Sequence, residues 1–258
     1  MELDNLANAV QVGPTQLPKL HQLLVEAAEV LDIKTPALFV KQNPQPNAYT
    51  MAVNGDKPVV VVHSSLLALC DDAETQAILA HELGHLKCEH GIWLSLGNLA
   101  GVGAAGIPLI GETLDAVIQN QLQEWQRAAE FSCDRAALLV AQDPKVVVSA
   151  LLKLVGGGIG VNGGATGTAT GKLDVEAFLQ QAEQYNAALK KARPAVRASM
   201  GLANAPRTHP LPVTRVAELD RWARGAEYSG MVKRAEQRQV VGQQRIQEVV
   251  GQQRIQEE

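Results

Sequence analysis

Apolar side chains recur at helical spacing over much of this chain, so helices are its main predicted element. Residues 17–31 carry leucines and alanines three and four positions apart, as in a helix that packs one side against a core. A second helix is predicted to begin at Asp71 or Asp72, either of which can cap it, and to run through His90 until Gly91 ends it. The same criteria predict four more helices: residues 122–142, 146–155, 174–191 and 212–224.

Three short apolar runs with a different pattern lie between the first two helices: residues 37–42, 48–53 and 58–63. Runs of this length predict strands. Asn54-Gly55 joins the second run to the third, and both residues accept positive φ, so a β-hairpin is predicted there. The expected fold is α+β and mainly helical, with a small β-sheet.

The composition of the chain restricts its fold class, its partners and its location. Aromatic residues make up only 3% of the 258 residues, so the core must be aliphatic and rich in alanine, which favours helices over a sandwich or barrel. The formal net charge of −4 gives no basic surface for a nucleic-acid partner. Three cysteines are too few for a disulfide framework, so a reducing compartment is expected. The acidic start of the chain lacks the regions of a signal peptide, and a cytoplasmic location is predicted.

The chain is predicted to form one domain at residues 1–235, followed by a polar tail at 236–258. Residues 156–171 are rich in glycine and are expected to form a flexible loop. The tail carries the sequence VVGQQRIQE twice, at 240–248 and 249–257, and has too little apolar surface to pack by itself. A solvated helix is the favoured interpretation of this tail, and a self-association or docking segment is the alternative.

The strongest chemical signal is the sequence HELGH, which lies inside the second predicted helix. His81 and His85 are four residues apart, so they differ by about 40° around the helix and can bind one Zn²⁺. Glu82 lies about 100° from His81, where it can reach a water on the metal. Zinc lowers the pKa of such a water to about 7, and Glu82 can accept its proton as general base. The alternative is that the two histidines lie on one helix by chance. This interpretation is disfavoured, because a helix this apolar buries the histidines and buried imidazoles need partners.

A third histidine ligand on the same helix is not available. The longer motif HExxHxxGxxH requires glycine and histidine where this chain has Cys88 and Gly91. His90 lies about 180° from His81 around a continuous helix. His90 is therefore expected to cap the helix or to face solvent.

A carboxylate from another helix is the remaining type of third ligand. Glu130 can ligate, and Asp134, one turn further on, can accept the free N–H of a ligating histidine. Glu124 falls on a different face and is the weaker candidate. An ion pair of Asp134 with Arg127 or Arg135 is the alternative to this role.

Three more residues could take part in the chemistry. Cys133 could act as a fourth ligand and close the metal site to catalysis, although a packed small apolar side chain is the favoured interpretation. His209, in a Thr-His-Pro sequence, could donate to the oxyanion of a tetrahedral intermediate. Arg215 is expected near the metal ligands, like Asp134, where it could orient His209 or bind a substrate carbonyl.

The combination of HELGH, AAEFSCDRAA and RTHPLPVTRVAEL resembles the HtpX-like and CAAX-prenyl-protease-like zinc metallopeptidases, over roughly Leu20 to Trp222. The resemblance implies a zincin-like domain of the gluzincin type, with one zinc per chain and a small edge sheet over the active-site helix. It also implies that Glu130 is the third ligand and that His209 assists the transition state. The branch that it resembles most is the soluble-looking one of cyanobacteria and plastids, whose plant members associate with plastoglobules.

The same resemblance places the peptide substrate. Asn47–Thr50 would match the edge strand along which the peptide lies as an added strand, with Asn47, Ala48 and Tyr49 as substrate-binding residues.

Residues 92–111 form an uncharged stretch of 20 residues, close to the length of one membrane span. A single crossing would place His85 and Glu130 on opposite sides of the bilayer, where they could not share a metal ion. Two crossings need about 40 residues. A buried helical hairpin or a loop that touches a membrane is therefore expected, whereas HtpX proteins carry convincing transmembrane helices in this place.

The sequence thus predicts a zinc-dependent endopeptidase that acts on a peptide or protein, with Glu82 as its general base. One alternative is a catalytically silent peptide- or membrane-binding protein with a structural zinc. Another is a membrane-surface scaffold that works through residues 92–111 and the tail. Substrate identity and oligomeric state are not predicted.

Overall fold

The computed structural model describes residues 2–51, 58–156, 173–196 and 210–235. The chain divides into two compact units, residues 1–219 and 220–258. The predicted Asn54-Gly55 turn, His209, the repeat-containing tail and all but the first residue of the glycine-rich loop lie outside the described residues. The predicted boundary between domain and tail at residue 235 stays a prediction.

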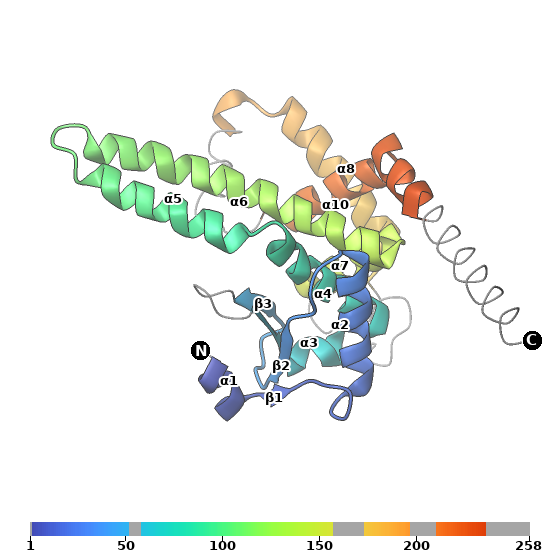
Figure 1. Ribbon diagram of the computed structural model, residues 1–258. Coiled ribbons are helices and arrows are strands. Elements are labelled where there is room, and N and C mark those ends of the chain that lie inside the picture. Colours follow the sequence, from blue (N-terminus) through green and yellow to red (C-terminus); the bar gives the residue numbers. More distant parts are fainter. Residues whose placement is uncertain (1, 52–57, 157–172, 197–209, 236–258) are drawn as a thin grey trace, which may run out of the picture. The chain divides into compact units, whose positions relative to one another are not determined.

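Helices dominate the first unit and flank a small sheet (Figure 1). The helices are α1 (Glu2–Asn8), α2 (Pro18–Val30), α3 (Ser64–Leu69), α4 (Asp72–Lys87), α5 (His90–Ala105), α6 (Gly111–Ala141), α7 (Pro144–Gly156), α8 (Val175–Lys191) and α10 (Pro212–Ala223). The strands are β1 (Val10–Gln11), β2 (Ala37–Lys41), β3 (Ala48–Met51) and β4 (Val59–His63). The predicted α+β, mainly helical fold is confirmed.

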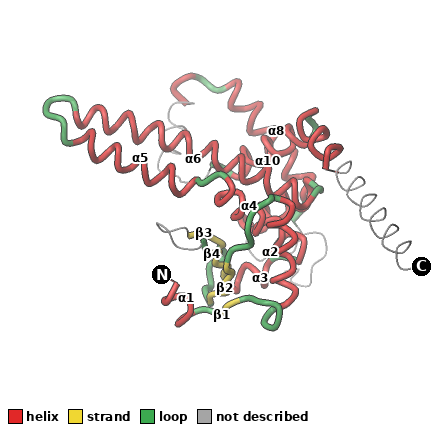
Figure 2. Tube along the Cα trace, viewed as in Figure 1, coloured by secondary structure: helices red, strands yellow, loops and turns green. Residues whose placement is uncertain are grey.

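The sheet has the strand order β1-β2-β4-β3, with its strands in yellow in Figure 2. β2 pairs with β4 in parallel, and β3 pairs with β4 in antiparallel orientation. β3 is therefore an edge strand of the sheet. The three predicted strands are confirmed, and the two-residue β1 is an addition that the pattern did not indicate.

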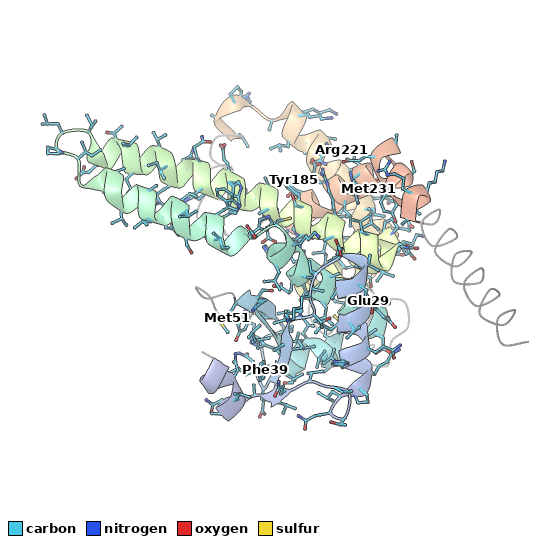
Figure 3. The ribbon with its side chains drawn as sticks, in the orientation of Figure 1. Glu29, Phe39, Met51, Tyr185, Arg221 and Met231 are labelled. Carbon is cyan, nitrogen blue, oxygen red and sulfur yellow. The ribbon has the colours of Figure 1, made fainter. Side chains whose placement is uncertain are left out.

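The two faces of the sheet enter different clusters, because successive side chains of a strand point to opposite sides. Val60 and Val62 of β4 are completely buried in the main core, together with leucines and alanines of α2 and α4. Val59 and Val61 point to the other face, where they pack with Phe39, labelled on β2 in Figure 3. The main core thus fixes α4, which carries the HELGH sequence, against the sheet.

The helix α4 begins where the sequence predicts and ends earlier. Asp71 and Glu74 close a capping box at its start, each side chain accepting from the other residue's backbone N–H. The helix ends at Lys87, and Glu89 takes a φ of 53° before the next helix begins. The prediction that this helix continues through His90 is wrong. Glutamate is not a residue type that indicates positive φ, so the turn left no signal in the sequence.

The helices α5 and α6 lie side by side as a long antiparallel hairpin (Figure 1). Gly101 permits their close approach, since a Cβ there would lie 2.6 Å from Asp115 Oδ1. The prediction of a buried hairpin within residues 92–111 is wrong. That segment forms one arm and the tip, α6 supplies the second arm, and most apolar side chains of the segment are exposed. No described helix combines the length and hydropathy that crossing a membrane requires.

Candidate metal centre

His81 and His85 lie one turn apart on α4. Leu79 and Leu83 of the same helix are completely buried in the main core, and this packing fixes the rotation of α4 about its axis. The two imidazole rings meet edge to face with their centroids 5.2 Å apart. Their side chains are only 12% and 23% exposed, so both imidazoles need polar partners.

Glu130, on α6, faces both imidazoles. Its Oε2 lies 3.4 Å from His81 Nε2, and its Oε1 lies 3.4 Å from His85 Nε2. The two helices approach closely at Gly84, where a Cβ would lie only 3.1 Å from Cys133 Cα. The glycine of HELGH thus helps to bring the carboxylate within reach of the histidines.

A zinc ion fits this set of donors. Imidazole nitrogens and carboxylate oxygens bind zinc at about 2.0–2.2 Å in tetrahedral geometry, so neighbouring ligand atoms stand about 3.4 Å apart. Each histidine Nε2 lies 3.4 Å from a Glu130 oxygen. That separation is longer than an ordinary N–H···O hydrogen bond and matches the spacing of two atoms that share a metal ion.

Asp134 connects His81 to Arg215 of α10. Asp134 Oδ1 lies 3.1 Å from His81 Nδ1. Arg215 donates from Nε to Oδ2 at 2.9 Å and from Nη2 to Oδ1 at 2.5 Å. Burial raises the pKa of Asp134, but the Arg215 guanidinium and the hydrogen bond from His81 outweigh burial and hold this pKa below its ordinary value. Asp134 is therefore a carboxylate, able to accept the Nδ1–H proton of His81.

The pKa of His81 reflects the same neighbours. Burial lowers this pKa, whereas hydrogen bonds with Asp134 and Glu130 raise it by more, and the net result is a pKa of about 9 instead of 6.5. Without a metal ion, His81 is therefore a cation at neutral pH. A metal ion that binds His81 Nε2 must displace this proton.

Glu82 contacts the edge strand. The Thr50 hydroxyl of β3 donates to Glu82 Oε2 at 2.9 Å and lies 3.2 Å from the backbone oxygen of Glu82. Pairing with β4 fixes β3, so Thr50 holds this carboxylate in a defined orientation. Nothing in the sequence indicates this contact of Thr50, because a threonine in a strand is common and gives no signal of its own.

His90 joins the cluster, so the prediction that it caps the helix or faces solvent is wrong. Its Nδ1 lies 3.1 Å from Nδ1 of His85 and 3.6 Å from Sγ of Cys133. Its ring meets Trp125 at 90°, with the centroids 5.3 Å apart. Burial and the neighbouring His85 lower the pKa of His90. The predicted position of His90 assumed one unbroken helix, whereas the chain turns at Glu89 and a new helix, α5, begins at His90.

Cys133 is buried on α6, and its sulfur and one ring nitrogen each of His81 and His85 lie within 4.8 Å of one another. Burial, and next the charge of Glu130, raise the pKa of this thiol far above its ordinary value. A thiolate, not a thiol, binds metals. Cys133 and Glu130 thus both lie beside the two histidines, whereas Glu124 is exposed and does not line the cavity at this site.

A cavity of about 860 Å³ adjoins these residues and has the size of an ordinary ligand site. His81, His85, Glu82, Glu130, Asp134 and Arg215 all line it. Asn47, Ala48 and Tyr49 line the same cavity, so the structure brings the residues predicted for substrate binding to the predicted metal ligands.

Arg215, predicted to support the metal ligands together with Asp134, contacts that residue. Its guanidinium pairs with Asp134 and lies 3.8 Å from Glu130 Oε2, rather than standing ready for a substrate carbonyl. Its partner on α6 is 81 residues away in the sequence, a separation that no spacing rule covers.

The chain is similar in sequence to known proteins. The sequence pattern of peptidase family M48 matches residues 14–223. The chloroplastic plastoglobule-localized metallopeptidase 48 of Arabidopsis thaliana is 48% identical over 234 residues, which are 91% of this chain and 65% of that relative. Protease HtpX homolog 2 of Methanosarcina mazei is 27% identical over 169 residues, which are 56% of this chain and 58% of that relative. The chain thus spans less than two thirds of the length of either relative.

A crystal structure of S. mikatae Ste24p is similar with a TM-score of 0.43 and 17% identity, over 76% of this chain and 49% of that one. The plant relative is named for a plastoglobule location, so the predicted cytoplasmic location finds no support in its similarity to this chain. The family recognised from the motifs is confirmed. The match at residues 14–223 covers most of the chain and every residue of the candidate metal centre, and the chain therefore belongs to peptidase family M48.

Proposed function

We propose that this chain is a zinc-dependent endopeptidase, with His81, His85 and Glu130 as metal ligands and Glu82 as general base. The observation that carries the proposal is the convergence of two imidazole nitrogens on one carboxylate, each 3.4 Å from an oxygen of Glu130. Membership of a peptidase family and the cavity beside these side chains support the same chemistry.

The general base is held by the edge strand. Zinc, when bound, supplies the Lewis acidity that polarises a peptide carbonyl and makes water a nucleophile near neutral pH. Glu82 takes the proton of the attacking water and returns it to the leaving amine. Because Thr50 donates to Oε2 of this carboxylate, we propose Oε1 as the oxygen that accepts the proton.

Asp134 and Arg215 act on the ligands rather than on the substrate. Asp134 accepts the Nδ1–H proton of His81, which leaves the Nε2 lone pair for the metal ion. Arg215 offsets the negative charge of Asp134 and of nearby Glu130. His209, which lies outside the described residues, stays the proposed donor to the oxyanion.

The peptide substrate is proposed to lie along β3. Asn47, Ala48 and Tyr49 line the cavity, and β3 is an edge strand, whose outer side can pair with an extended peptide. Backbone hydrogen bonds of this kind recognise a peptide without regard to most of its side chains.

The first experiment compares wild type with Glu82→Gln for cleavage of an unfolded test protein, with the zinc content of both recorded. We expect one zinc per chain in both proteins and cleavage by the wild type alone, because glutamine cannot accept the proton. Zinc in both without cleavage by either would favour a catalytically silent binding protein. Absence of zinc from both would overturn the proposed ligand set.

The alternative to a catalytic zinc is a structural zinc with Cys133 as a further ligand. It is supported by the closeness of this sulfur to both histidines. Replacing zinc by cobalt distinguishes a site with Cys133 as a ligand from a site without it, because a thiolate ligand adds strong charge-transfer absorption. We expect no such absorption. We also expect Cys133→Ala to retain zinc and Glu130→Ala to lose it.

We also propose that the α5–α6 hairpin rests on a lipid surface. Its exposed large apolar side chains are Ile92, Trp93, Leu96, Leu99, Val102, Ile107, Leu109, Ile110, Leu114 and Val117. Residues 92–111 carry no charge, and Asp115 on the other arm packs toward Gly101. Exposed apolar surface of this kind is typical of binding sites. Glu112 is an exposed charged residue between Ile110 and Leu114, and the uncharged surface of residues 92–111 suits lipid. The plant relative is named for a plastoglobule location, which supports this choice of partner.

The matching experiment is flotation of the protein with neutral-lipid droplets. A triple variant Leu96→Gln, Leu99→Gln and Val102→Gln is expected to lose flotation while it retains zinc. A control variant, Val30→Gln with Val155→Gln, removes side chains of similar exposure on α2 and α7 and should still float. Undiminished flotation of the triple variant would refute the lipid contact.

A further inference from the structure

His90 lies beside a proposed metal ligand without facing the proposed metal position itself. Its Nδ1 is 3.1 Å from Nδ1 of His85, and the two rings stand at 76° with their centroids 5.1 Å apart. The other nitrogen of His85, Nε2, faces Glu130 at 3.4 Å. The two nitrogens of His85 thus have separate partners, a carboxylate on one side and a second imidazole on the other.

The backbone between α4 and α5 places His90 there. Cys88 caps the end of α4, and Glu89 adopts a left-handed φ of 53° that redirects the chain. His90 is then the first residue of α5. Trp125 of α6 packs edge-on against its ring and limits the rotation of the side chain.

The geometry points to His90 as a positioning residue that accepts a hydrogen bond from His85 and so orients it toward the metal ion. This inference rests on the proposed function, because only a metal ion on Nε2 fixes the proton of His85 on Nδ1. Ligating histidines are generally held through their other nitrogen, most often by a carboxylate or a carbonyl. Asp134 serves His81 in that way, and His90 serves His85 with the lone pair of an imidazole.

The buried thiol of Cys133 is the other described group near His90 Nδ1, at 3.6 Å. The thiol is only a weak hydrogen-bonding group, so the imidazole of His85 at 3.1 Å is the stronger partner of this nitrogen. In this arrangement Cys133 contacts His90 and is not itself a metal ligand.

Two substitutions separate hydrogen bonding from packing. His90→Asn carries an amide oxygen close to the position of Nδ1, so it can still accept from His85. His90→Phe retains an aromatic ring against Trp125 but has no acceptor. His21→Phe makes the same chemical change on α2, at a distance from the centre, and serves as the control.

The measurement is the zinc dissociation constant of each protein in competition with a chelator, together with the thermal midpoint of its metal-free form. We expect His90→Phe to raise the dissociation constant about tenfold to a hundredfold, the usual effect of losing such a partner. His90→Asn and His21→Phe should stay close to the wild type, and all metal-free midpoints should be similar.

Equal zinc affinity of His90→Phe and wild type would overturn the inference. So would equal loss in the Asn and Phe variants, because that result would mark His90 as a ligand or as a packing residue. If the wild type binds no zinc, the proposed function fails first, and the inference fails with it.

Discussion

Arg215 holds Asp134 with two hydrogen bonds, from Nε at 2.9 Å and from Nη2 at 2.5 Å, and Asp134 in turn contacts His81. These side chains come from α10, α6 and α4, so one ion pair connects three helices at the candidate metal centre. Both partners of the pair are largely buried, with side-chain exposures of 13% and 3%. Removing one partner therefore leaves a buried charge without compensation.

Arg215→Ala is expected to reduce the free energy of unfolding by about 3–5 kcal/mol, the usual cost of breaking a buried ion pair from one side. Arg215→Lys retains the charge but loses the two-pronged geometry, so a smaller loss is expected. Urea unfolding of the metal-free proteins measures both values. A fully stable Arg215→Ala protein would show that water reaches Asp134.

Thr50→Val is expected to lower kcat while the zinc content stays unchanged. The hydroxyl of Thr50 fixes one oxygen of Glu82, and one hydrogen bond is worth about 0.5–1.5 kcal/mol, which corresponds to a rate loss of about 2- to 13-fold. Thr50→Ser retains the hydroxyl and should recover most of the rate. Steady-state kinetics on a fluorogenic peptide provides the measurement, and an equal loss in both variants would contradict the role of the hydrogen bond.

The metal-free protein is expected to lose stability as the pH rises from 6.5 to 9. The pKa of His81 in the folded state, about 9, lies above its ordinary value of 6.5, so protonation of His81 stabilises the fold. This contribution is complete below pH 6.5 and disappears as the pH passes through about 9. Urea unfolding at pH 6, 7.5 and 9.5 tests the sign, with metal-free His81→Gln as a control that should lack this pH-dependent part.

Zinc binding should show the opposite trend over the same range. The metal ion displaces the proton of His81, so the apparent affinity is expected to rise about tenfold per pH unit below pH 9. Chelator competition at several pH values gives the slope. A flat profile between pH 6.5 and 8.5 would mean that His81 is already neutral before zinc binds.

Gly84→Ala is expected to destabilise the protein by about 1–3 kcal/mol, as overpacking of a close contact commonly does. The added methyl would lie 3.1 Å from Cys133 Cα and would push α6, and with it Glu130, away from the histidines. Zinc affinity should fall as well. Gly103→Ala is the matched control, because nothing lies within 4 Å of a Cβ there. That helical substitution should be neutral or slightly stabilising, so a similar loss in both variants would argue against the close contact.

Much of the fold could be predicted from local patterns. The strands β2, β3 and β4 and the helices α2, α7 and α8 all lie close to their predicted positions, because hydrophobic periodicity and capping residues act over short distances. The turn at Glu89 and the early start of α6 at Gly111 were missed. Glutamate gives no signal for a left-handed turn. The first part of α6 is rich in polar residues, so its hydrophobic pattern was too weak to predict a helix.

The sequence by itself determined the chemistry of the centre. Two histidines four residues apart on a helix, with a glutamate between them, restrict the metal and the reaction before any packing is known. The tertiary structure decided which distant groups serve these residues: Thr50 on Glu82, Arg215 on Asp134, and His90 on His85. These partners meet because separate helices and strands pack together and because the chain changes direction at a turn. Packing and turns of this kind do not produce a fixed spacing of residues in the sequence. Side-chain chemistry is thus encoded locally, whereas the orientation of each side chain depends on contacts that form only in the folded chain.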